Sequence, residues 1–188
     1  MKITLEWLRE KRACQEGVYW FKNQDLTDAG ALALKVLSIG RYDWANWLLT
    51  RCFNKEQSVK YAIFAAELVL DIYEKRYPNN DRPRKAIEAA KAYLEDPTDG
   101  NKKAAYAAAY AAAAAYVAAY AAAAAYAAAY AAAYAAAAAD AYAAAYAAAA
   151  AAAYAAAAAD AAAAADAYAA ALKEKIIRYG VELFGDEK

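Results

Sequence analysis

Residues 104–120 read AAYAAAYAAAAAYVAAY, and nearly the same composition continues to residue 171. This Ala/Tyr tract, residues 104–171, contains 53 alanines, eleven tyrosines, three aspartates and one valine. It has no glycine, proline or basic residue, and alanine has the highest helix propensity of all residues. The tract is therefore predicted to be helical throughout. The remaining residues, whose composition is ordinary, must supply what the tract packs against.

The positions of the tyrosines around a helix indicate whether the tract is one helix or several. A single helix would be about 100 Å long at 1.5 Å per residue and would expose its tyrosines without a partner. The tyrosines at 106–120 share one arc, and those at 126–134 share a different arc. This drift predicts several closely packed helices near 101–121, 124–138, 141–158 and 161–184, with Asp140 and Asp160 as N-caps.

The first hundred residues contain a series of shorter helical patterns with capping residues before them. Thr4 is a suitable N-cap for a helix that begins at Leu5, and a second short helix is expected over 14–21. Thr27 or Asp28 is expected to cap the third helix, which Gly40 ends. Asp43 is predicted to cap a fourth helix over 44–49. Apolar residues at helical spacing, including all four tryptophans, are interpreted as core.

Two further helices and a boundary follow. A long helix is predicted over 56–77, and Asp81 is expected to cap another over 82–95. The cluster Asp-Pro-Thr-Asp-Gly at 96–100 is the clearest boundary in the chain. The sequence therefore predicts an all-α fold, a multi-helix array of short N-terminal helices followed by closely packed, antiparallel Ala/Tyr-rich helices. An N-terminal helical region, 1–96, is expected to pack with an Ala/Tyr-rich region, 97–188, as one domain.

Composition argues against several classes of function. Basic and acidic residues number 22 each, so no strong overall field favours nucleic acid. Without histidine the chain lacks the commonest general base and metal ligand, so we expect no enzyme, no catalytic residue, no metal and no cofactor. Cys14 and Cys52 are predicted to be buried free thiols, which suits a cytoplasmic protein. Alanine contributes little to membrane insertion, and no membrane association is expected.

One basic cluster stands out, around a Pro/Asn turn between the two longest conventional helices. An exposed cationic corner of this kind favours an acidic protein surface. Tyrosines at the start of the Ala/Tyr tract are candidates for the same role. The predicted partner-binding residues are Lys75, Arg76, Arg82, Arg84, Lys85, Tyr106 and Tyr110.

The same corner carries a family resemblance. Residues 66–90, AELVLDIYEKRYPNNDRPRKAIEAA, resemble the signature of the immunity proteins that accompany polymorphic toxin genes in bacteria and phages. The specific part is Tyr-Pro followed by Asp-Arg-Pro-Arg-Lys-Ala-Ile-Glu-Ala-Ala. The resemblance implies an all-α protein with an alanine-rich second half and no established catalytic residues.

These observations lead to one principal functional hypothesis and two alternatives. The principal one is a non-enzymatic, immunity-type helical protein that binds and neutralises a toxin or another effector protein. One alternative is a phage counter-defence protein that sequesters a small ligand in a tyrosine-lined pocket. The other is a structural helical assembly module, for which a homo-oligomer stays open.

Overall fold

The computed structural model describes residues 1–116 and 166–185, and within them it contains eight helices and no β-strand. The protein is therefore all-α, as predicted. The predicted helices 124–138 and 141–158, with the caps Asp140 and Asp160, lie outside the described residues. The helices are α1 (Leu5–Glu10), α2 (Gln15–Lys22), α3 (Ala29–Ser38), α4 (Tyr42–Cys52), α5 (Lys55–Arg76), α6 (Arg82–Glu95), α7 (Asp99–Tyr116) and α10 (Asp166–Glu182).

Short-range polar contacts begin the first and third helices. The Thr4 hydroxyl accepts a hydrogen bond from the Trp7 amide at 3.1 Å, as predicted for the cap of α1. Of the two candidates for the cap of α3, the structure selects Asp28, whose carboxylate accepts from the Ala31 amide. Backbone hydrogen bonds from Ile3 to Thr27 and from Ala29 to Met1 then tie the start of the chain to the start of α3.

The fourth helix begins differently from the prediction. Gly40, with a φ of 78°, ends α3 in the left-handed conformation that glycine adopts without strain. The N-cap of α4 is Arg41, with no side-chain cap hydrogen bond, so the prediction of Asp43 as the cap is wrong. Asp43 lies inside the first turn of α4, where its carboxylate pairs with Arg41 instead.

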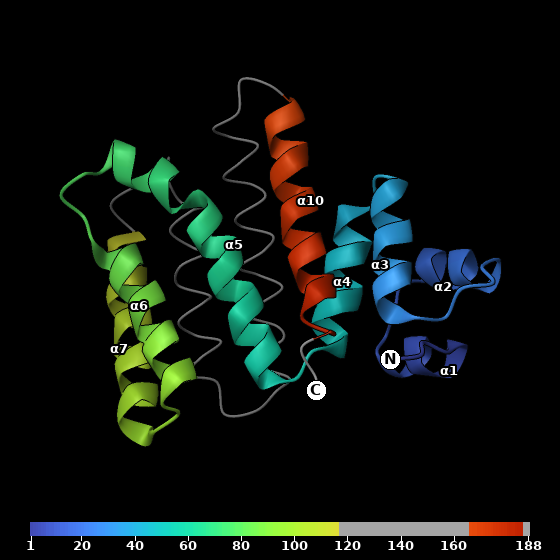
Figure 1. Cartoon of the computed structure of the whole chain (residues 1–188), viewed down its shortest axis with the longest axis horizontal. Helices are drawn as coiled ribbons and strands as arrows, with labels where there is room; N and C mark the ends of the chain where they lie inside the picture. The colour runs from blue at the N-terminus through green and yellow to red at the C-terminus, as the bar shows by residue number, and fades with distance from the viewer. Residues whose placement is uncertain (117–165, 186–188) are drawn as a thin grey trace.

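The long helix α5 and its neighbours follow the sequence closely. Asn54 and Gln57 form a reciprocal capping box at the start of α5. Asp81 occupies the N-cap position of α6 as predicted, but its carboxylate makes no cap hydrogen bond and pairs with Lys85. Helix α7 begins at Asp99, inside the predicted boundary cluster, and α6 and α7 lie side by side at one end of the molecule (Figure 1).

The C-terminal helix completes the core. Helix α10 contacts α3, α4 and α5, so the end of the chain packs on helices from its first half (Figure 1). Ile176, Ile177 and Leu183 are fully buried there. Gly180 fits so tightly that a Cβ atom at this position would lie 2.8 Å from both Leu49 and Tyr61. Helix α10 is described from Asp166, and residues 161–165 of the predicted helix lie outside the described range.

The buried polar groups of this core are paired. The Tyr61 hydroxyl donates to the Asn46 side-chain carbonyl at 3.0 Å, and Thr50 donates to the Asn46 backbone carbonyl. The side-chain amide of Gln57 donates to the backbone carbonyl of Leu183 at 2.8 Å. This hydrogen bond ties the end of α10 to the start of α5. Each buried polar side chain in the described part of the chain thus has a partner, as a dry core requires.

Candidate functional site

The predicted basic corner is formed where α5 and α6 meet. Arg84 Nε and Nη2 donate to the two carboxylate oxygens of Glu74, at 2.7 and 2.5 Å. Lys85 Nζ lies 2.8 Å from Asp81. The hydrogen bond with Glu74 raises the pKa of Arg84, and the one with Lys85 lowers the pKa of Asp81. Two of the predicted cations are therefore neutralised within the corner itself.

Two other predicted cations remain available. Lys75 and Arg82 are exposed, and neither forms an ion pair with any described residue. The turn beneath them is held by Asn80, whose side chain donates to the Tyr73 hydroxyl at 2.8 Å and accepts from the Arg82 amide at 3.3 Å. Burial raises the pKa of the Tyr73 hydroxyl, so it stays protonated. The corner thus presents two exposed cations, at the end of α5 and at the start of α6, on either side of an anchored turn.

The other predicted partner residues are only partly placed. The side chains of Arg76 and Tyr110 lie outside the described part of the structure. Tyr106 is 45% exposed on α7, the helix beside α6. Its exposure agrees with a surface role on a helix that packs beside α6.

A second candidate site lies at the opposite end of the molecule. Between the pair α1–α2 and the pair α3–α4 is a cavity of about 390 Å³. We call it the tryptophan cavity, because Trp20, Trp44 and Trp47 line it together with aliphatic side chains such as Leu8 and Leu32. Three polar side chains also line it, namely Arg12, Cys14 and Asp43.

Aromatic contacts hold the two helix pairs together across this cavity. Trp7 of α1 meets Trp47 of α4 edge to face, with ring centroids 6.1 Å apart. Trp20 of α2 meets Trp44 of α4 in the same way at 6.3 Å. All four rings are partly buried and pack against the hydrophobic core, and three of them also line the cavity. Large rings that meet at their edges leave space between them, which explains the cavity.

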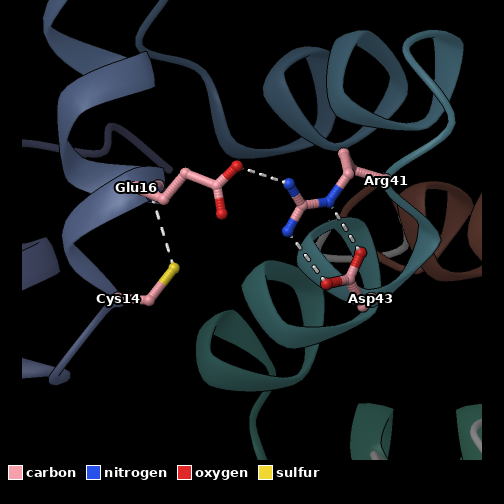
Figure 2. A network of polar contacts seen from close by, with 5 residues as sticks. Cys14, Glu16, Arg41 and Asp43 are labelled. Carbon is pink, nitrogen blue, oxygen red and sulfur yellow. Dashed lines mark hydrogen bonds and ion pairs between the residues drawn. The ribbon is translucent and has the colours of Figure 1, made fainter.

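A polar network crosses one side of the cavity (Figure 2). The Arg41 guanidinium donates to Glu16 of α2 at 2.9 Å and to both carboxylate oxygens of Asp43 at 3.2 Å. It also lies 3.6 Å from the centroid of the Trp44 ring. Burial alone would raise the pKa of Asp43, but hydrogen bonds from Arg41 and from the Trp44 amide outweigh it and lower that pKa. The network therefore stays ionised and joins α2 to α4.

The two cysteines differ from each other. Cys14 is exposed at the start of α2, where its sulfur accepts from the Gly17 amide at 3.4 Å, so the prediction of a buried thiol is wrong there. An N-cap side chain must stay near free backbone amides, which keeps it at a helix end. Cys52 is half-buried, and burial raises the pKa of its thiol to about 12. Both are free thiols.

The comparison with protein families separates the two candidate sites. The model of the Imm-5 like putative immunity protein family matches residues 49–181 of the 188. The chain belongs to this family. The resemblance seen in residues 66–90 is thus confirmed, and the α5–α6 corner lies inside the family segment. Every residue that lines the tryptophan cavity precedes it.

Beyond this family match, the chain has few features that point to a function. No curated protein and no solved structure matches the chain. Among the described residues, no helix is both long and apolar enough to cross a bilayer, and no group of acidic and cysteine side chains could hold a metal ion. The family membership therefore supports an immunity-type role. The exposed residues of the family segment indicate which surface a partner could bind.

Proposed function

We propose that this protein is a non-enzymatic immunity protein, which neutralises a protein toxin by binding it through the α5–α6 corner. The observation that carries the proposal is the pair of exposed cations, Lys75 at the end of α5 and Arg82 at the start of α6, which flank a turn within the segment that matches the family. Immunity proteins of this family have a toxin as their general partner. Exposed cations at an interface accelerate encounter with an acidic partner and suppress wrong partners.

The local structure supports a preformed binding surface. The two parallel hydrogen bonds between Arg84 and Glu74 join α6 to α5, and Asn80 ties the turn to Tyr73. A turn fixed in this way loses little conformational freedom when it binds, which favours affinity. The pairing of Arg84 also assigns it to holding the corner together, so Lys75 and Arg82 are the better candidates for direct contact.

Co-expression with the toxin encoded beside this gene tests the proposal. The unaltered chain is expected to restore growth and to copurify with the toxin. The double variant Lys75→Glu, Arg82→Glu is expected to lose most of the rescue, because two attractive charges become repulsive. A matched control is Lys103→Glu, Lys175→Glu, which reverses two exposed charges on α7 and α10 and should keep the rescue.

The outcomes separate the function from the surface. If the unaltered chain neither binds the toxin nor restores growth, the immunity proposal fails for that toxin. If it does both and the corner variant does so equally well, the function stands and the assigned surface is wrong. The alternatives of a tyrosine-lined ligand pocket and of an assembly module stay predictions, because most tyrosines of the Ala/Tyr tract lie outside the described residues.

A further inference from the structure

Arg12 has an unusual backbone conformation at the mouth of the tryptophan cavity. Its φ of 58° makes it the one non-glycine residue with positive φ among those the structure describes. The Arg12 amide donates to the carbonyl of Arg9, and the Ala13 amide donates to that of Leu8. This is the Schellman ending of a helix, in which the left-handed position is usually glycine. A side chain at this position strains the backbone, and such strain clusters at functional sites.

The side chain of Arg12 has no charged partner among the described residues. It lines the tryptophan cavity and is exposed to solvent at the cavity mouth. The other charged lining residue, Asp43, is held by Arg41, which also binds Glu16. The acidic groups of the rim are thus already neutralised in part, whereas the Arg12 guanidinium keeps its donors free for an anionic group.

The walls of the cavity define the rest of a ligand. Three tryptophans and a set of aliphatic side chains suit a flat apolar body, which can stack on or lie against indole rings. A volume of about 390 Å³ falls in the range of small-molecule sites. A cationic ligand is disfavoured, because Arg41 already occupies the face of Trp44. Free Arg12 would also repel it.

We propose that the tryptophan cavity binds a small aromatic anion, with the ring between the tryptophans and the carboxylate or sulfonate on Arg12. The inference is independent of toxin binding, since all the residues involved precede the segment that matches the family. It also explains why an arginine stands where glycine would be the less strained residue. An arginine can donate two parallel hydrogen bonds to a carboxylate, which glycine cannot.

Calorimetric titration of the full chain with 2-naphthoate and 2-naphthamide tests this inference. The two probes share the same rings and differ in charge. We expect the unaltered protein to bind naphthoate roughly tenfold more tightly than naphthamide. A charge-assisted interaction with Arg12 at a partly exposed site would give a difference of this size. In Arg12→Gly the ratio of the affinities for naphthoate and naphthamide should fall to about one. The urea midpoint of this variant should rise, because glycine adopts the left-handed conformation without strain.

Two matched variants complete the test. Arg9→Ala removes an exposed positive charge from the same helix, outside the cavity lining, and should keep the preference for naphthoate. Val36→Phe fills the cavity from α3 and should abolish binding of both probes. The inference is overturned if neither probe binds the unaltered protein, if both bind equally well, or if Arg12→Gly retains the preference.

Discussion

The two sides of helix α4 pack in opposite ways. Toward α5 and α10, the packing is tight, since Ala45 and Leu49 of α4 are fully buried and Gly180 of α10 is pressed against Leu49 and Tyr61. Toward α1 and α2, the contacts are edge-to-face tryptophan pairs with centroids more than 6 Å apart. The first arrangement leaves no room for one methyl group, and the second leaves a cavity of about 390 Å³.

This difference shows that residue size alone does not decide how well an interface is filled. Alanine and glycine let helix axes approach until backbone and side chains are in contact. Tryptophan contributes more area per residue, but a rigid ring fills space only where a neighbour fits its outline. The close-packed side is therefore suited to stability, and the open side is suited to taking up a ligand.

The neighbouring leucines of α4 offer the sharpest test of this contrast. Leu49 is fully buried against Gly180, whereas Leu48 lines the tryptophan cavity. Leu49→Ala is expected to lower the free energy of unfolding by about 3–5 kcal/mol, and Leu48→Ala by about 1–2 kcal/mol less, because Leu48 already has fewer packing partners. Urea unfolding followed by circular dichroism measures both. Equal losses would contradict the contrast between the two sides.

Two glycines extend the comparison with a smaller expected effect. Gly180→Ala places a methyl 2.8 Å from Leu49 and Tyr61, and we expect a loss of about 1–3 kcal/mol in spite of the better helix propensity of alanine. Gly17→Ala in α2 meets only the movable Cys14 sulfur, at 3.3 Å. It should be neutral or stabilising by up to about 1 kcal/mol. Thermal unfolding of both variants decides, and a stabilised Gly180→Ala would show that α10 is not tightly packed.

The smallest effect concerns the thiols at alkaline pH. The pKa of Cys52 is about 12 in the folded protein, against 9.0 for an unburied thiol. Above pH 9 the unfolded chain loses this proton first, so stability present below pH 9 falls as the pH rises toward 12, by on the order of 1 kcal/mol at pH 10. Cys52→Ser should remove the part of this loss of stability that comes from the Cys52 thiol.

The exposed cysteine is the control for this measurement. Cys14→Ser is the matched substitution at an exposed position, and the loss that comes from Cys52 should remain in it. Urea midpoints at pH 7, 9 and 10 supply the comparison. Part of the loss should persist in Cys52→Ser, since burial raises the pKa of Tyr61 well above 10 and Tyr61 is unaffected by the substitution. An identical pH dependence for both cysteine variants would refute the assignment.

Local features of the fold were predictable from the sequence. These features depend on residues within about one helical turn of each other. The confirmed ones are the cap Thr4, the cap Asp28 as one of two candidates, the stop at Gly40 and the range of α6. Leu172, Ile176 and Leu183 recur at helical spacing, and all three are buried. The basic corner was found because its residues are contiguous in the sequence.

The errors arose where a side chain has a choice of partners or surroundings that its local pattern does not reveal. Asp43 is a good capping residue by type, but Arg41 binds its carboxylate with two hydrogen bonds and also reaches Glu16, 25 residues earlier. The tryptophan cavity was missed because half-buried tryptophans have the same spacing as core residues. One signal of the cavity was available in the sequence. Arg12 follows α1 at a position where a helix usually ends with glycine.

The hydrogen bond between Gln57 and Leu183 has a consequence for the order of folding. It joins residues 126 positions apart, and the Gly180 contact with Leu49 spans a comparable separation. The faces of α3, α4 and α5 that receive α10 cannot be covered until α10 has been synthesised. Contacts of such long range slow folding. A nascent chain therefore keeps part of its apolar core exposed until α10 has left the ribosome, and the core is completed only then.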